Sequence, residues 1–240
     1  MRATTSFTNF TSGEISDLLD GRTDLTRYTN AAKSLTNFMV HPAGGAARRP
    51  GTKFIHEVKS SAAAVRLIPF EFNTTTANTY ILEFGNLYFR VFRDGGIVTE
   101  ANVTVSGITQ ANPAVVTANS HGYSNDDHVI LNSVAGMTEV NGLTFVVKSK
   151  TTNTFQIQNV DGTNINSTGY TAYSSAGTSA KIFQVTTPYT TAQVSDIKFT
   201  QSADVMYLTH VDHAPRKLTR TAHTTWTLSI PTFVNGPYLD

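Results

Sequence analysis

The side chains best suited to chemistry lie close together near the C-terminal end, at His210, Asp212 and His213. Imidazole and carboxylate groups at this spacing can bind zinc or manganese. A complete site needs further ligands, and none beyond these two imidazoles and the carboxylate between them can be identified in the sequence. Histidine and aspartate at a strand end also commonly bond to the local backbone. We therefore interpret these residues as part of a turn and predict no metal site.

Two further groups of residues could bind a ligand. Asp126 and Asp127 could supply calcium ligands from a loop, although a solvated turn is the commoner role of adjacent aspartates. Trp226 and Tyr207 could form a platform for a sugar ring, although aromatic residues of strands more often pack in a core. We expect a structural role for all four.

The sequence lacks the common catalytic motifs. It contains no G-x-S-x-G, no G-x-x-x-x-G-K-[ST] and no G-x-G-x-x-G. It has no cysteine, which excludes disulfides, thiolate metal sites and a cysteine nucleophile. A Ser-His-Asp hydrolase remains an alternative, and it would lose turnover on His210→Ala or His213→Ala. We predict no catalytic residues, no cofactor and no enzyme activity.

Composition limits the partners. The chain has 240 residues, enough for one large or two small domains, and its net charge is +1 with only 15% charged residues. A strongly basic face is not expected, so tight sequence-independent binding of nucleic acid is not indicated. The N-terminus has no apolar signal-peptide core, and eighteen apolar residues never run together. We expect no signal peptide and no membrane-spanning segment.

The first part of the chain predicts one short helix and a shaped loop. Asp24–Leu35 has an N-cap candidate and apolar residues spaced for one helical face. Strands at Met39–Val40 and Lys53–Val58 are expected on either side of a glycine-rich loop. The loop residues that fix the backbone or carry charge are Pro42, Gly44, Gly45, Arg48, Arg49, Pro50 and Gly51.

Arg48 and Arg49 have two possible roles. They could be solvated, as exposed arginines usually are, and composition alone favours this role. Alternatively, their guanidinium groups could bind carboxylates or carbonyls of a neighbouring subunit.

Residues 64–100 predict an antiparallel meander. Strand-like runs are separated by turn residues at Gly85-Asn86 and at Asp94-Gly95-Gly96. Opposite charges could pair across these strands, each pair contributing roughly 0.2 to 1 kcal/mol. The residues concerned are Glu71, Glu83, Arg90 and Arg93.

Composition changes near Asn102. Residues 104–183 are rich in Thr, Asn, Ser, Gly and Val, with short strands separated by turns such as Asn141-Gly142. This pattern predicts a small all-β module. The stretch resembles a small β-barrel repeat likened to the FCCH domain of ubiquitin-activating enzymes, which is a likeness of fold and implies no ubiquitin chemistry.

Residues 184–240 are expected to return to the first β frame. Strands are predicted at Asp204–His210, Pro215–Thr219 and Thr225–Ile230, in the arrangement of one propeller blade. The chain as a whole is predicted to be mainly β. It would comprise an N-terminal β frame with a short helix (1–103), an inserted small β-barrel (104–183) and blade-like strands (184–240).

Several motifs occur in a fixed order. They are FTSGE, GRTDLTRY, NFMVHPAGGAARRPGT and IPFEF, followed much later by QSADVMYLTHVDHAPRKL. This series resembles the tail nozzle proteins of podovirus-type phages, also called tail tubular or phage stabilisation proteins. Relatives in that family continue beyond the position of Asp240, so whether Asp240 is the natural terminus is left open.

The resemblance implies a structural virion protein without enzymatic activity. Its subunits would form a closed ring, six-fold in the family, below the portal and adaptor of a short phage tail. The phage DNA would pass through the lumen without sequence-specific binding, and the adaptor and tail fibre proteins would be partners. The protein would be assembled in the host cytoplasm and reside in the virion.

The resemblance also favours the intersubunit role of the glycine and arginine loop. The expected interface residues are Gly44, Gly45, Arg48, Arg49, Pro50 and Gly51. The alternative function is a tail-associated module that binds carbohydrate or a receptor through the inserted β-domain.

Overall fold

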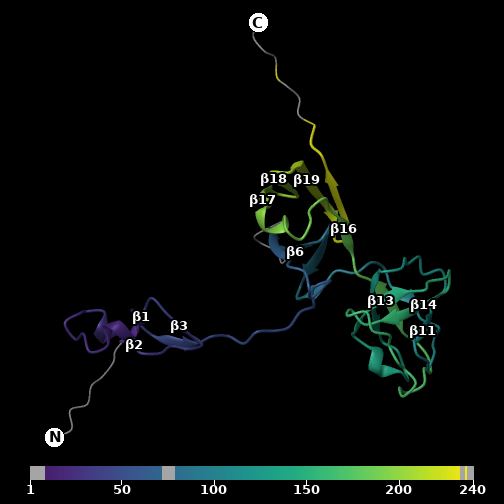
Figure 1. Cartoon of the computed structure of the whole chain (residues 1–240), viewed down its shortest axis with the longest axis horizontal. Coiled ribbons are helices and arrows are strands. Elements are labelled where there is room, and N and C mark those ends of the chain that lie inside the picture. Colours follow the sequence, from purple (N-terminus) through teal and green to yellow (C-terminus); the bar gives the residue numbers. More distant parts are fainter. Residues whose placement is uncertain (1–8, 72–78, 233–235, 237–240) are drawn as a thin grey trace. The chain divides into compact units, whose positions relative to one another are not determined.

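The computed structural model describes residues 9–71, 79–232 and 236. Contacts divide the chain into two compact units, Met1–Phe54 and Ile55–Asp240, a boundary that the sequence did not predict. The described part is mainly β, and its sheets are antiparallel apart from one short parallel pair, which confirms the predicted fold class (Figure 1). The helices in these ranges are 3-10 helices of three residues each.

No helix within the described ranges has the length and apolar character needed to cross a membrane.

The N-terminal unit consists of short elements joined by turns. Strand β1 pairs in parallel with β2, and β3 pairs antiparallel with β4. The elements are β1 (Gly13–Glu14), η1 (Asp17–Leu19), η2 (Tyr28–Asn30), β2 (Ala31–Ala32), β3 (Phe38–Val40) and β4 (Ala46–Arg48).

The predicted helix at Asp24–Leu35 is wrong. Arg22 binds Asp24 with two hydrogen bonds of 2.8 and 2.7 Å, and the chain then passes through turns and η2 into β2. Ala31 and Ala32 pair with Gly13 and Glu14 instead of continuing a helix. A short helix is stable only when its apolar face is buried, and this unit has too little core to bury one. The expected strand at Lys53–Val58 is also absent, because β3 pairs with β4.

The larger unit begins with a five-stranded antiparallel sheet. Its strand order is β16-β7-β6-β5, with β8 paired to β7. The strands are β5 (Arg66–Glu71), β6 (Thr79–Gly85), β7 (Tyr88–Arg93), β8 (Gly96–Ile97) and β16 (Gln184–Thr186). The expected meander is therefore present, and the chain returns to it at β16.

The two hairpin turns of the meander differ in how well the sequence placed them. Asp94 and Gly95 have φ angles of 52° and 73°, and they join β7 to β8 as expected. The β6–β7 turn is shifted by one residue, because Gly85 pairs with Tyr88 and the loop consists of Asn86 and Leu87. Leu87 adopts a positive φ of 64°, which is uncommon for a residue other than glycine.

A second sheet of seven strands follows, in the order β10-β11-β14-β13-β12-β15-β9. It surrounds a core that includes Phe145, Phe155, Leu131 and Met137. Its elements are β9 (Val103–Thr104), β10 (Gly107–Ile108), β11 (Val115–Thr117), β12 (His128–Asn132), η3 (Thr138–Val140), β13 (Thr144–Lys148), β14 (Thr154–Gln158) and β15 (Thr178–Lys181).

The expected closed barrel is wrong for this sheet. Strands β10 and β9 lie at its two ends and are not paired with each other in the described structure. Each is only two residues long, so each offers few backbone groups for a closing ladder.

The C-terminal strands form a four-stranded antiparallel meander in the order β17-β18-β19-β20. The three strands predicted here are present, and β17 is an additional strand that the sequence did not indicate. The elements are η4 (Val194–Asp196), β17 (Lys198–Ser202), β18 (Val205–His210), β19 (His213–Ala222) and β20 (Thr225–Ser229).

One hydrophobic core joins this meander to the five-stranded sheet. Trp226 lies at its centre, with ring centroids 4.8 Å from Phe70, 5.5 Å from Tyr80 and 5.9 Å from Phe89. Met206, Leu208 and Leu218 belong to the same cluster and are fully buried. These aromatic contacts fix the two sheets against each other.

A candidate assembly surface on the N-terminal unit

The glycine loop closes the hairpin of β3 and β4. Phe38 pairs with Arg48, and Val40 pairs with Ala46. At the turn, the His41 amide donates to the Gly45 carbonyl at 2.8 Å, and the Gly44 amide donates to the His41 carbonyl at 2.9 Å. The loop therefore has a defined shape, as the prolines and glycines predicted.

Gly44 is the glycine that this shape requires. Its φ is +100°, and a Cβ atom there would lie 2.6 Å from the Cβ of Asn9. The Gly44 carbonyl accepts a hydrogen bond of 2.8 Å from the Phe10 amide. A side chain at Gly45, by contrast, would meet no atom within 4 Å. The loop is thus held against residues 9 and 10 through Gly44.

Arg48 and Arg49 lie on the exposed side of the hairpin. Arg48 is the last residue of β4, and the Arg49 amide donates to the Asn37 carbonyl at 2.8 Å. Both side chains are exposed, and neither guanidinium makes a hydrogen bond or ion pair within the part of the chain that the structure describes. Pro50 and Gly51 follow and are exposed too. Of the six predicted interface residues, only Gly44 is buried.

The N-terminal unit also exposes large apolar side chains. Phe38 and Met39 on β3 are 50% and 51% exposed, Phe54 is 74% exposed and Leu18 is 91% exposed. Ala31 is the one hydrophobic residue that is buried among residues 9–54. In a folded domain most large hydrophobic residues are buried. This unit instead leaves its large hydrophobic side chains exposed and has almost no hydrophobic core.

The free energy of apolar burial in this unit is small compared with the entropy lost on ordering its backbone. Ordering a residue costs about 1–2 kcal/mol of backbone entropy, whereas apolar burial returns about 25 cal/mol per Å². One buried alanine cannot offset the ordering of some four dozen residues, and domains this small usually need a staple or a partner. Since the chain has no cysteine, a disulfide cannot supply the missing stability. Among residues 9–54 the structure thus shows little apolar burial to stabilise the conformation described.

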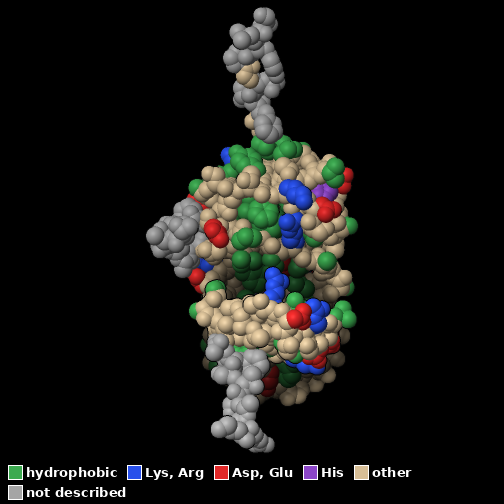
Figure 2. Space-filling model, turned by 90° about the vertical axis from the view of Figure 1, so that its left-hand side faces the viewer, with side chains coloured by type: hydrophobic (Ala, Val, Ile, Leu, Met, Phe, Trp, Pro, Cys, Tyr) green, Lys and Arg blue, Asp and Glu red, His purple; other side chains and the backbone are tan. Residues whose placement is uncertain are grey.

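The hairpin segment is also uniformly basic. Residues 34–54 carry Arg48, Arg49 and Lys53 and contain no Asp or Glu. Both basic and acidic side chains are visible in the space-filling view of Figure 2. The positive charge of the hairpin segment is local, and it would suit binding to a small acidic surface.

The histidine pair at the β18–β19 turn makes local contacts. The Asp212 amide donates to His210 Nδ1 at 3.1 Å, and His213 Nε2 lies 3.0 Å from the Gln193 side-chain oxygen. The two imidazole centroids are 5.4 Å apart. Groups of three or more His, Cys, Asp or Glu side chains able to hold a metal do not occur among the described residues.

The aspartate pair of the second sheet has basic neighbours. Asp126 Oδ1 lies 2.5 Å from Lys148 Nζ, which lowers the pKa of the Asp126 carboxyl. Asp127 accepts a hydrogen bond of 2.8 Å from the Ser124 amide and lies 3.5 Å from Lys181 Nζ. Both carboxylates are therefore engaged in turn and ion-pair contacts.

Trp226 and Tyr207 do not form a joint platform. Trp226 is buried in the core between the sheets, and its indole N–H donates to the His223 carbonyl at 2.9 Å. Tyr207 lies on β18 and is exposed. A sugar could therefore not stack on both rings.

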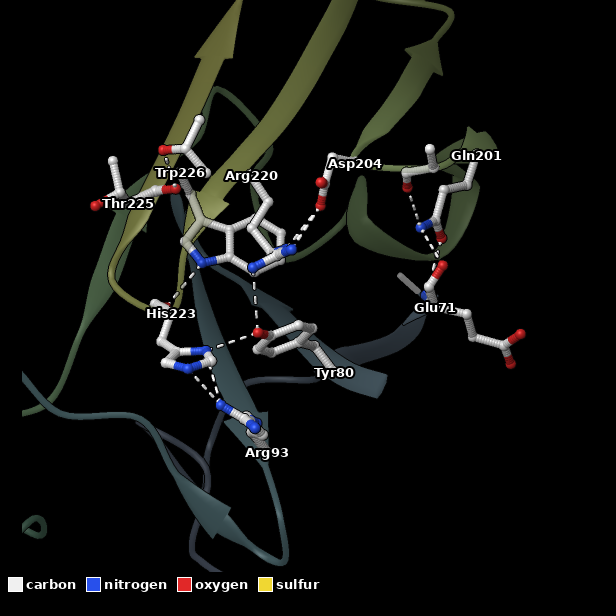
Figure 3. A network of polar contacts seen from close by, with 11 residues as sticks. Glu71, Tyr80, Arg93, Gln201, Asp204, Arg220, His223, Thr225 and Trp226 are labelled. Carbon is white, nitrogen blue, oxygen red and sulfur yellow. Dashed lines mark hydrogen bonds and ion pairs between the residues drawn. The ribbon is translucent and has the colours of Figure 1, made fainter. Parts of the chain in front are cut away.

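A polar network beside Trp226 connects the two sheets (Figure 3). The Tyr80 hydroxyl lies 2.7 Å from His223 Nδ1 and accepts a hydrogen bond of 3.3 Å from Arg220. Arg220 also binds Asp204 at 2.8 Å, and Arg93 lies 2.9 Å from His223. The network satisfies polar groups at the edge of the core, and its role is structural.

A buried polar row on the five-stranded sheet was missed by sequence reasoning. Glu83 and Arg90 pair across β6 and β7, as the charge pattern suggested, but they are only 2% and 1% exposed. The Glu83 carboxylate accepts a hydrogen bond of 2.8 Å from the Tyr88 hydroxyl. Burial and this contact raise the pKa of Tyr88, and burial lowers the pKa of Arg90. The sequence indicated that these charges could pair across strands but not that they are buried, because the pattern of one sheet does not show what covers its face.

Comparison with known proteins gives one partial match. A family model described as the ubiquitin-activating enzyme E1 FCCH domain matches residues 110–182, less than a third of the chain. The matched residues include strands β11 to β15 of the seven-stranded sheet and the segments that join them. No curated protein matches the chain. The match is a likeness of one segment and assigns no family to the whole chain.

Proposed function

We propose that this chain is a structural subunit of the tail of a short-tailed bacteriophage. Copies of it form the ring of the tail nozzle, attached below the portal and adaptor, and genomic DNA passes through the lumen. Its partners are other copies of itself, the adaptor and the tail fibre proteins. It is assembled in the host cytoplasm and works in the virion without catalysis. The ordered motifs in its sequence are the basis of the phage assignment.

One structural observation carries the assembly part of the proposal. The N-terminal unit presents Phe38, Met39, Arg48 and Arg49 to the surface while burying one alanine. Such a segment gains stability only by binding another surface. In a ring, head-to-tail contact supplies that surface at every subunit, provided that each subunit carries two different complementary patches.

The charge distribution fits passage of DNA. The net charge is +1, from 18 basic and 17 acidic residues. A strongly basic lumen would hold the duplex through counterion release and slow its exit. A nearly neutral subunit leaves the duplex free to slide.

Native mass spectrometry and negative-stain imaging of the purified protein, alone and with adaptor, test the proposal. We expect a closed ring from the wild-type protein and loss of the ring in the charge-reversal variant Arg48→Glu/Arg49→Glu. The matched control is Lys150→Glu/Lys198→Glu, which reverses two exposed cations of the larger unit and should assemble normally. A wild-type protein that stays monomeric both alone and with adaptor would refute the proposal.

A further inference from the structure

A polar pocket lies on the outer face of the seven-stranded sheet. Val129 and Val147 are buried in the core of that sheet, and side chains alternate along a strand, so His128 and Val146 point away from the core. The register places His128 beside Val146, and Val146 beside Gln158, and all three side chains line the pocket. The pocket has a volume of about 420 Å³, which is within the range of small-molecule sites.

Other lining residues come from the first part of the larger unit. Asn86 and Tyr88 belong to the β6–β7 hairpin, and Lys59 lies on the segment that precedes β5. Lys59 is half-buried, and its Nζ donates a hydrogen bond of 2.9 Å to the side-chain oxygen of Gln184 on β16. The same Nζ lies 5.0 Å from the centre of the Tyr88 ring. Segments far apart in the sequence therefore build this pocket together.

The charged groups that line the pocket are two lysines and one carboxylate. Asp126 and Lys148 form an ion pair at 2.5 Å. No carboxylate pairs with Lys59 in the part of the chain that the structure describes, and its printed polar partner is the neutral amide of Gln184. One positive charge is therefore in excess at the pocket surface.

The charged groups just outside the lining do not reverse this excess. Arg90 lies opposite Glu83 in the register of β6 and β7, and Lys181 lies 3.5 Å from Asp127. Lys181 is also 3.4 Å from Glu100, which is exposed and does not line the pocket. Solvent and salt screen an exposed carboxylate, so the cation in the pocket wall dominates locally.

Buried donors close to the lining lack partners. Arg90 is 1% exposed, and its Nε and Nη2 have no hydrogen-bond partner among the described residues, nor do the two ring nitrogens of His128. Burial, and next the charge of Arg90, lowers the pKa of Lys59. Burial, and next the charges of Arg90 and Lys59, lowers the pKa of His128. The potential here is positive, and buried donors without partners are rare unless a bound water or ion accompanies them.

We propose that this pocket binds a small oxyanion, a phosphate or carboxylate group, with Lys59 as its principal ligand. The Lys59 ammonium has three N–H donors and Gln184 takes one, so two remain for anion oxygens. Lys148 lines the same pocket and is the second cation. The positive potential from Arg90 adds to the attraction, although Arg90 itself does not line the pocket. The bound anion links the segment before β5 to the seven-stranded sheet, and this inference is independent of ring assembly.

Isothermal titration calorimetry of the full chain with inorganic phosphate, and separately with succinate, tests the proposal. Sodium chloride keeps the ionic strength constant, so that general charge screening is the same throughout. We expect saturable binding of one anion per chain. Tighter binding of phosphate would identify a phosphate site, and tighter binding of succinate would identify a carboxylate site. Failure of both anions to bind saturably would overturn the proposal.

Lys59→Gln tests the principal ligand. It removes the excess cation and should weaken anion binding roughly ten-fold, the effect of losing a hydrogen bond to a charged group. The matched control is Lys198→Gln, which removes an exposed lysine of β17 outside the pocket and should bind as the wild type does. Equal affinities of Lys59→Gln and wild type would overturn the assignment of Lys59.

Asp126→Asn separates anion binding from damage to the fold, because tighter binding is expected. It removes the lining carboxylate and releases Lys148, which should raise the affinity roughly three-fold, the effect of one nearby charge in a solvated pocket. Asp212→Asn, which removes an exposed carboxylate of the C-terminal meander, is the matched control and should leave the affinity unchanged. Weaker or unchanged binding in Asp126→Asn would overturn the placement of the anion in this pocket.

Discussion

At the scale of single residues, His128 lies in an environment that its sequence context does not indicate. It lies on β12 and is 9% exposed, and both ring nitrogens are buried without a hydrogen-bond partner in the described structure. Burial and the nearby positive charges of Arg90 and Lys59 lower its pKa from 6.5 to about 4. The folded protein therefore keeps this imidazole neutral at a pH where an unfolded chain would protonate it.

This pKa shift predicts an acid-sensitive fold. Between pH 6.5 and pH 4 the unfolded state binds a proton that the folded state does not, so the free energy of unfolding falls as the pH is lowered. The shift corresponds to a loss of about 3 kcal/mol across this window. In His128→Leu we expect most of this pH dependence to disappear, as measured by urea unfolding at pH 7 and pH 4.5.

The control for this experiment is His41→Leu, which removes an exposed histidine from the hairpin turn. It should retain the wild-type difference in stability between the two pH values. An unchanged pH dependence in His128→Leu would show that His128 is not the group responsible.

At the scale of elements, the stability of the larger unit depends on the contact between the five-stranded sheet and the C-terminal meander. Trp226 supplies the apolar part of this contact, and the network of Tyr80, His223 and Arg220 closes its edge (Figure 3). The blade-like meander predicted from the sequence is thus an integral part of the first β frame.

Tyr80→Phe tests the polar part of the contact. It removes the hydroxyl that lies 2.7 Å from His223 and accepts from Arg220, while the ring that packs on Trp226 remains. Leaving these partners unsatisfied should cost about 1–3 kcal/mol in the free energy of unfolding. Tyr207→Phe, on the exposed face of β18, should change stability by less than about 0.5 kcal/mol. Equal stability losses in the two variants would contradict a specific role for the network.

At the scale of the whole molecule, the two units differ in what stabilises them. The larger unit has two clusters of fully buried residues, whereas the N-terminal unit has almost none. Regions with few buried apolar contacts open locally at low cost in free energy. The order of the N-terminal unit should therefore depend on assembly.

Hydrogen exchange of the assembled ring and of the Arg48→Glu/Arg49→Glu monomer tests this dependence. Amides of β2, β3 and β4 should exchange at least ten-fold faster in the monomer, because their partner surface is missing. Amides of β6 and β12 serve as the internal control and should exchange at similar rates in both samples. Strong protection of the hairpin in the monomer would contradict the inference that this unit needs a partner.

The sequence by itself determined the local features of this protein. Strand-like apolar runs between turn residues placed β5 to β7 and the strands around Trp226, and Asp94-Gly95 placed a hairpin turn, because turn angles and strand preference are set by neighbouring residues. The glycine loop was also readable, since Gly44 adopts a conformation that disfavours other residues. Whether its arginines contact a neighbouring subunit stays a prediction.

Only the tertiary structure decided the features that depend on distant partners. The absence of a helix at 24–35 follows from the lack of a core to cover it, and the open seven-stranded sheet follows from end strands that do not meet. The burial of Glu83, Arg90 and His128 depends on chain segments far away in sequence. Contacts of this kind are set by how elements pack together. The residue pattern of a single element does not reveal which distant segments will pack against it.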